Sequence, residues 1–125
     1  MMRGGALAVV FVLALAGCAS APTDPDAPKD VSGQNIAPYE VHQECRNLVA
    51  GDRLDYRFTS SSPVSFNIHY HEINAVVIPL SREGVTADSG IFQPTAPHEF
   101  CLTWEAGGVP VVVSYRVGVR HRRPS

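Results

Sequence analysis

The sequence lacks a charge excess of either sign and contains few cysteines. Its 125 residues include 10 lysines and arginines, 12 aspartates and glutamates, and 3 cysteines. Nucleic-acid binding over a broad surface needs a strongly basic face, so the near balance of charge argues against that class of protein. No Cys-x-x-Cys pair occurs, which argues against a dithiol redox site.

No pattern typical of an enzyme is present. The chain has no Gly-x-Ser-x-Gly turn, no phosphate-binding glycine loop, no His-Glu-x-x-His pattern and no calcium-binding loop. Asp88-Ser89-Gly90 lacks the glycine that would complete a nucleophile turn, and the acidic residues are scattered with no recognisable pair. We therefore expect a protein without enzymatic activity.

Long apolar runs are absent beyond the N-terminus. Residues 6–16 are apolar and follow one basic residue, Arg3. Such a run is too short to span a bilayer core, which takes about 20 residues in a helix. It has the length of the apolar region of an export signal, so residues 1–17 are expected to be a cleaved signal peptide.

The residues before the first cysteine resemble the lipobox of bacterial lipoproteins. They read Leu15-Ala16-Gly17-Cys18, and Ala19 and Ser20 follow. The resemblance implies that the Cys18 thiol is lipidated, which would anchor the chain to a membrane. Aspartate does not follow Cys18. By resemblance to the lipoprotein sorting rules of Gram-negative bacteria, this implies the outer membrane, with the chain facing the periplasm. An ordinary secretory signal with an incidental cysteine is the alternative.

Residues 18–37 have the composition of a tether. The stretch contains Pro22, Pro25 and Pro28, is rich in small and acidic residues, and has Val31 and Ile36 as its larger apolar side chains. Such composition cannot form a core. We expect a disordered spacer between the lipid and a folded domain at residues 38–125.

The folded part is expected to be all-β. The 10 glycines and 10 prolines argue against a helical bundle. Apolar residues alternate with polar or small ones around residues 54–59, 64–71, 100–105 and 111–120, and turn-forming residues lie between these runs. Less regular strands are expected at residues 39–45, 74–80 and 84–92. This pattern predicts a small antiparallel β-sandwich of seven to eight strands.

Cys45 and Cys101 are the two cysteines that remain beyond Cys18. Because the cell envelope is oxidising, they are expected to form one structural disulfide.

Several short motifs resemble the GOLD domain of early-secretory cargo receptors. They are residues 49–56 (VAGDRLDY), 63–68 (PVSFNI), 90–92 (GIF) and 99–104 (EFCLTW), which follow Cys45 in this order. The resemblance implies a β-sandwich with one disulfide between its first and late strands, and protein or lipid binding in place of catalysis. The chain lacks the coiled coil, membrane helix and sorting tail of those receptors, so their trafficking role is not implied.

His69 and His71 are candidate ligands for copper or zinc. Residues two apart on a strand project from one face, and these two should point away from the core. Two imidazoles on one face suit a borderline divalent metal. A third ligand would have to come from Glu72, His42 or His98. The alternative is a solvated or hydrogen-bonded histidine pair.

The C-terminus collects basic residues. Arg116 and Arg120 share one side of the last expected strand, and Arg122 and Arg123 follow it. These arginines could contact an anionic lipid or an acidic partner in the envelope. A solubilising tail that protects a sheet edge is the alternative.

Two functions from different classes follow. The first is a membrane-anchored periplasmic binding module without enzymatic activity. The second is a periplasmic copper- or zinc-binding protein that uses the His-Tyr-His strand.

Overall fold

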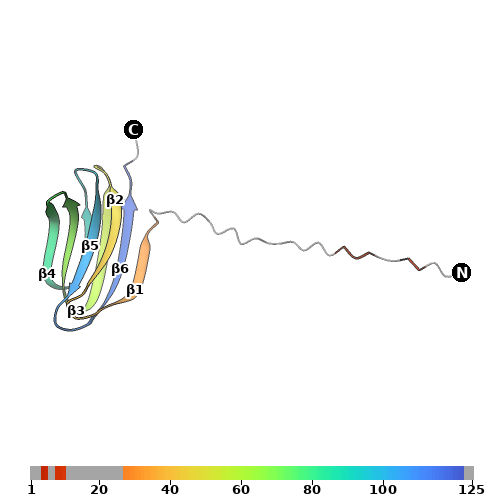
Figure 1. The fold of residues 1–125 in the computed structure, drawn as a ribbon, viewed down its shortest axis with the longest axis horizontal. Helices are drawn as coiled ribbons and strands as arrows, with labels where there is room; N and C mark the ends of the chain where they lie inside the picture. The colour runs from red at the N-terminus through yellow and green to blue at the C-terminus, as the bar shows by residue number, and fades with distance from the viewer. Residues whose placement is uncertain (1–3, 6–7, 11–26, 123–125) are drawn as a thin grey trace.

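Six β-strands form the folded part of the chain (Figure 1). A computed structural model describes residues 4–5, 8–10 and 27–122. Within these residues, no helix has the length and apolarity needed to cross a membrane. The strands are β1 (Lys29–Ile36), β2 (Val41–Leu48), β3 (Arg53–Glu72), β4 (Ala75–Phe92), β5 (His98–Ala106) and β6 (Val111–Arg120).

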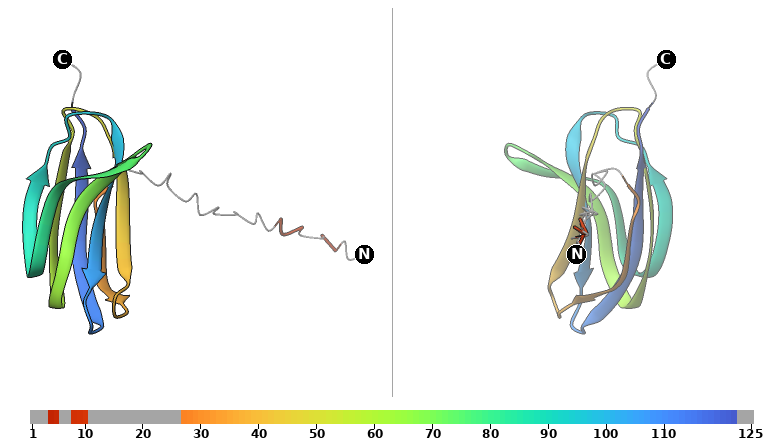
Figure 2. Two further views of the ribbon diagram at one scale, coloured as in Figure 1. Left: turned by 60° about the vertical axis from the view of Figure 1, so that its left-hand side comes forward. Right: turned by 90° about the vertical axis from the view of Figure 1, so that its right-hand side faces the viewer.

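The strands form two facing layers that share β3 and β4 (Figure 2). Residues 53–60 of β3 pair with β6, residues 64–69 pair with β5, and β4 pairs with β3 in both halves. We call the half with β1 and β6 the β6 layer, and the half with β2 and β5 the β5 layer. The hairpin between β3 and β4 projects from the body in Figure 2, and Ile73 at its tip is 99% exposed.

The prediction of an all-β fold with one disulfide is confirmed, but the strands are fewer and longer than expected. Residues 60–63 and 81–84 have the composition of turns. In the structure they are bends within β3 and β4, marked by a shift of pairing register between Thr59 and Val64. Gly84 has a φ of 63°, which glycine adopts at little cost. A bend of this kind lets a strand pass from one layer to the other without ending.

The folded domain also begins earlier than the composition suggests. Residues 29–36, which the composition places in the tether, form β1 and pair with β6. Backbone hydrogen bonds to a sheet edge do not require alternating apolar residues, so the proline-rich composition hides this strand. Ile36 is buried and Val31 packs against the core, which ties the strand down. Residues 18–26 lie outside the described part of the chain.

Trp104 lies at the centre of the core between the layers. Its ring centre lies 4.5 Å from that of Tyr115 in β6 and 5.8 Å from that of Phe58 in β3. Aromatic pairs at these separations add to the free energy gained by burying their surface. The alternation predicted for β3, β5 and β6 therefore holds, because alternate residues of each strand form the core: Leu54, Tyr56, Phe58, Val64, Phe66, Ile68, Phe100, Leu102, Trp104, Ala106, Val111, Val113, Tyr115 and Val117.

The predicted disulfide joins two neighbouring strands of one layer. Cys45 of β2 and Cys101 of β5 are opposite each other in the register, with Cα atoms 4.0 Å apart. Both side chains alternate with core residues and lie on the outer face of the β5 layer. Because β1 precedes β2, the bond links the second strand of the domain to a late strand.

Replacing both cysteines, Cys45→Ala with Cys101→Ala, should lower the free energy of unfolding by about 4 kcal/mol, because the bond closes a loop of more than 50 residues in the unfolded chain. Urea unfolding of the full chain measures the change. Reducing the wild-type protein is the control and should give the same loss. An unfolding midpoint that reduction leaves in place would contradict the stabilising role.

Asp52 ties the turn between β2 and β3 to the C-terminal end of the domain. Asp52 is 1% exposed, and its carboxylate accepts hydrogen bonds from the N–H groups of Val49, at 2.9 Å, and Arg122, at 3.3 Å. His121 Nδ1 lies 3.2 Å from the same carboxylate. Burial alone would raise the pKa of Asp52, but these hydrogen bonds outweigh it and lower the pKa below its usual value.

The substitution Asp52→Asn should lower the free energy of unfolding at pH 7 by about 1–3 kcal/mol. A carboxyl group whose pKa is lower in the folded protein than in the unfolded chain stabilises the fold at pH values above its unfolded-state pKa. This stabilisation is lost as the pH falls through the folded-state pKa. The difference between wild type and variant should therefore shrink below about pH 4. Urea unfolding at pH 7 and pH 3 measures it. Asp55→Asn is the control, because Asp55 accepts no side-chain hydrogen bond within the described residues; equal losses in both variants would refute the role.

Candidate binding surfaces

The outer face of the β6 layer carries arginines in adjacent rows. Arg57 of β3 lies opposite Arg116 of β6, and Arg53 lies opposite Arg120. Asp55 lies opposite Gly118 in the row between them. Outward positions of paired strands alternate with core positions, so all these side chains share one face. We call Arg57, Arg116 and Arg120 the arginine face.

Two open hollows adjoin the arginine face. One of about 530 Å³ has Asp55, Ser89, Gly118 and Arg120 in its lining, and one of about 350 Å³ lies beside Ser114. Arg57 and Arg116 line both, so the two guanidinium groups separate them. A Cβ at Gly118 would meet only carbons of Pro28, at 3.9 Å, so the missing side chain helps to keep the larger hollow open.

The charges of the arginine face are only partly neutralised. Arg116 forms an ion pair with Asp30 of β1. Arg57 makes no side-chain hydrogen bond or ion pair to any residue that the structure describes. Arg57 is exposed, so its guanidinium presents donors to the solvent beside a second guanidinium.

The predicted basic cluster is thus divided. Arg116 and Arg120 lie on the arginine face. The Arg122 side chain instead packs against Gly51 in the turn between β2 and β3, so closely that any side chain at position 51 would place its Cβ 2.6 Å from the Cδ of Arg122. Arg123 lies outside the described residues. Arg57 was not among the predicted contact residues, although its outward position could be read from the alternation of Leu54, Tyr56 and Phe58. The pairing of β3 with β6, which brings Arg57 opposite Arg116, could not be read from the sequence.

On the opposite side of the molecule, His69 and His71 share the outer face of the β5 layer. Their ring centres are 5.2 Å apart. His69 is only 6% exposed and its Nδ1 donates a hydrogen bond to Asn67 Oδ1 at 2.8 Å, with Thr103 Oγ1 3.3 Å from the same nitrogen. Burial, and then the charge of His71, lower the pKa of His69, so this imidazole is neutral at pH 7.

The other two candidate histidines contact aromatic side chains. His98 stacks on Tyr70, with ring centres 3.8 Å apart, and it shares the side of β5 that carries Phe100. His42 points between the layers, where its Nε2 is joined to the Tyr115 hydroxyl by a 2.9 Å hydrogen bond. His98 also lines an open hollow of about 520 Å³ together with His71 and Glu72, whereas His42 does not line it.

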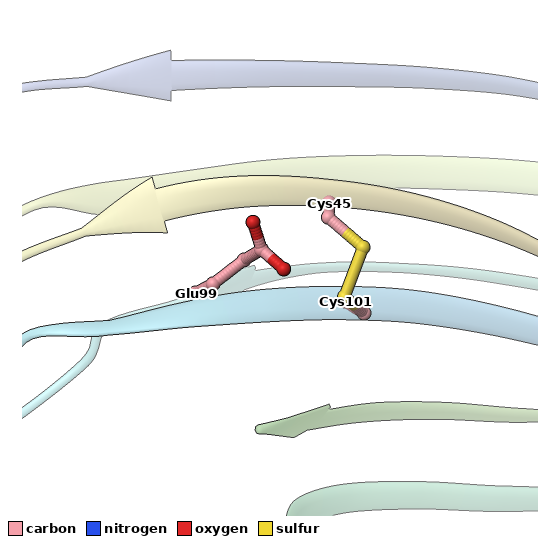
Figure 3. Close-up of side chains that lie close together, drawn as sticks. All are labelled: Cys45, Glu99 and Cys101. Carbon is pink, nitrogen blue, oxygen red and sulfur yellow. A yellow bond between two sulfur atoms is a disulfide. The ribbon is translucent and has the colours of Figure 1, made fainter. Parts of the chain in front are cut away.

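One group of three potential donors lies within 4.8 Å of one another in the described part of the chain: Cys45, Glu99 and Cys101 (Figure 3). Both sulfurs are joined in the disulfide, and a thiolate is the form of cysteine that binds metal. This group cannot hold an ion as it stands. It does place the Glu99 carboxylate on the outer face of the β5 layer.

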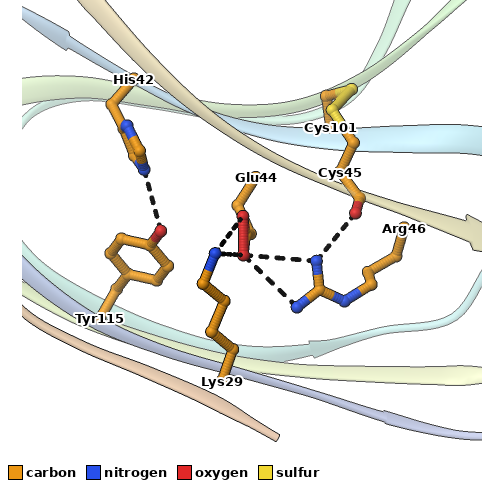
Figure 4. Close-up of polar contacts among 7 residues, drawn as sticks. All are labelled: Lys29, His42, Glu44, Cys45, Arg46, Cys101 and Tyr115. Atoms are coloured by element: carbon orange, nitrogen blue, oxygen red, sulfur yellow. Dashed lines mark hydrogen bonds and ion pairs between the residues drawn. A yellow bond between two sulfur atoms is a disulfide. The ribbon is translucent and has the colours of Figure 1, made fainter. Parts of the chain in front are cut away.

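Polar side chains close the gap between β1 and β2, at the open side of the sandwich (Figure 4). Glu44 is 8% exposed and faces inward, where its carboxylate lies 2.9 Å from Lys29 Nζ and 3.4 Å from Arg46 Nη1. Burial, and then the nearby Glu44, raise the pKa of Tyr115 to about 12. Burial lowers the pKa of His42. These groups are satisfied by one another, so the cluster has a structural role.

The comparisons with known proteins concern the fold alone. No known family matches this sequence, and no curated protein sequence matches it. Among solved structures, the chain is similar to PliG from Aeromonas hydrophila, a periplasmic inhibitor of g-type lysozyme. The two share 14% sequence identity with a TM-score of 0.56, over 74% of this chain and 86% of that chain. The chain therefore has a fold like that of a periplasmic lysozyme inhibitor.

Proposed function

We propose that this chain is a binding protein of the cell envelope that takes an acidic protein partner on its arginine face and catalyses no reaction. The observation that carries the proposal is the pair of neighbouring guanidinium groups, Arg57 and Arg116, between two open hollows. Arg57 has no partner within the described residues, so its charge is available to a ligand.

Guanidinium chemistry supports a carboxylate-bearing partner. Arginine binds carboxylates with two parallel hydrogen bonds, and it is favoured in ion pairs at protein interfaces. An exposed ion pair contributes little by itself, but a partner that excludes water from the hollows strengthens each contact. The hollows on both sides of the pair give such a partner room to enter.

The solved neighbour suggests which partner to test first. PliG is an inhibitor of a g-type lysozyme, so that neighbour binds a protein partner. Glycoside hydrolases commonly carry catalytic carboxyl groups in their cleft, which complement guanidinium groups. A g-type lysozyme is therefore the first protein with a carboxyl-bearing cleft to offer to the arginine face. Anionic lipid is the other source of negative charge, and vesicle binding separates the two.

The N-terminal sequence supports an anchored location. A lipid on Cys18, followed by residues 19–28 before β1, would hold the domain at a short distance from the membrane surface. We include anchoring at the outer membrane, on its periplasmic side, in the proposed function. An inhibitor or adaptor that is anchored to the outer membrane on its periplasmic side would meet protein partners that enter the envelope.

Reversing one charge tests the arginine face. Arg57→Glu should weaken binding of the full chain to a g-type lysozyme by about tenfold or more, because a repulsive contact replaces an attractive one. Calorimetry at low and high salt measures the affinity, and lysozyme activity reports inhibition. Arg82→Glu is the matched control, since Arg82 pairs with Asp88 outside the arginine face.

Two results would overturn the proposal. One is lysozyme binding that survives both Arg57→Glu and Arg116→Glu. The other is failure to bind the lysozyme together with Arg57-dependent binding to vesicles of anionic lipid, which would assign the face to a membrane.

The anchor is tested by Cys18→Ser. In a Gram-negative host, this variant should lose the mass of the attached lipid and move from the membrane fraction to the soluble periplasmic fraction. Mass spectrometry and membrane fractionation measure both effects. Ala19→Asp is the matched control: it should keep the lipid but change the membrane in which the protein resides. A Cys18→Ser protein that still sediments with membranes would refute lipid anchoring at this residue.

A further inference from the structure

His69 and His71 have the separation that a shared metal ion requires. Their rings project from the same face of β3, with centres 5.2 Å apart. A metal bonded to one nitrogen of each ring at about 2.1 Å places the ring centres about 5 Å apart. The backbone of β3 therefore holds the two ring centres at a separation compatible with one shared ion.

His69 is also fixed in the orientation that a ligand needs. Asn67 Oδ1 can only accept a hydrogen bond, so the proton of the neutral His69 ring lies on Nδ1 and Nε2 keeps its lone pair. Metal-binding histidines commonly donate their second ring nitrogen to such a partner. Thr103 packs at the same nitrogen from β5. One ligand is thus oriented before any ion arrives.

Glu99 supplies a third donor from the neighbouring strand. The antiparallel pairing of β3 with β5 ends with His69 opposite Cys101. Continued two residues further, the same register would bring the position of His71 opposite Glu99. The Glu99 carboxylate is exposed and lies beside the disulfide on the same outer face (Figure 3). His71 is exposed too, so both side chains can rotate toward an ion without displacing the core.

We propose that His69, His71 and Glu99 form a surface site for a borderline divalent cation, zinc or copper(II), with water completing its coordination. Two imidazoles and a carboxylate suit both ions, and copper(II) binds such donors more tightly than zinc. This site is separate from the arginine face, which belongs to the other layer. Glu99 takes the place of His98 in the ligand set that the sequence suggested. His98 lines the same hollow as His71, but its ring is stacked on Tyr70.

Metal titration of the full chain tests the site. After treatment with a chelator, the protein should bind one zinc ion or one copper(II) ion in calorimetry, with copper(II) the tighter. His71→Ala should weaken binding at least tenfold, and Glu99→Gln should weaken it to a smaller extent. His98→Ala tests the competing third ligand and should leave the affinity unchanged, because the His98 ring is stacked on Tyr70.

A spectroscopic measurement makes the ligand set specific. The electron paramagnetic resonance spectrum of the copper(II) complex should show coupling to two imidazole nitrogens in the wild type and to one in His71→Ala. Circular dichroism checks that each variant is folded, and His71 is exposed, so its loss leaves the core intact. Affinity that survives His71→Ala, or that falls as much in His98→Ala, would overturn the assignment.

Discussion

The pairing of β3 with β4 across both layers is the constraint on which the rest of the structure depends. These two strands bend together and keep their hydrogen bonds on either side of the bend, so one hairpin forms part of both layers. β6 can then pair with the first half of β3 and β5 with the second half. The layers face each other because they are two halves of one bent sheet, and the aromatic core around Trp104 fills the space between them.

The bend also explains which parts of the fold could be predicted from sequence. Alternation of apolar and polar residues is a local property of a strand, so the core faces of β3, β5 and β6 could be read directly. Serine, proline and glycine at residues 60–63 and 81–84 favour turns, bulges and bends alike. Tertiary pairing selects among these conformations, and no local pattern shows it. β1 was missed for the same reason, because its edge pairing with β6 involves mainly backbone groups.

The candidate sites divide in the same way. That Arg57, His69 and His71 point outward followed from alternation alone. The register between strands far apart in the sequence brings Arg57 opposite Arg116 and His69 opposite Cys101, and alternation alone does not show it. Glu44 faces inward from β2, where Lys29 and Arg46 neutralise it at the open side of the sandwich. A buried carboxylate is tolerated only with such partners.

Both proposed surfaces involve β3, but they lie on opposite sides of its bend. Arg57 projects outward from the β6 layer and His69 projects outward from the β5 layer, so the two point away from each other across the core. A protein on the arginine face therefore leaves the imidazoles open to an ion, and neither ligand competes with the other for space. Any coupling between them would have to pass through the packed aromatic rings of Phe58 and Phe66, which lie on either side of the bend with ring centres 4.7 Å apart. Because the two surfaces lie on opposite faces and share no hydrogen-bond or ion-pair partner within the described residues, their effects are expected to add.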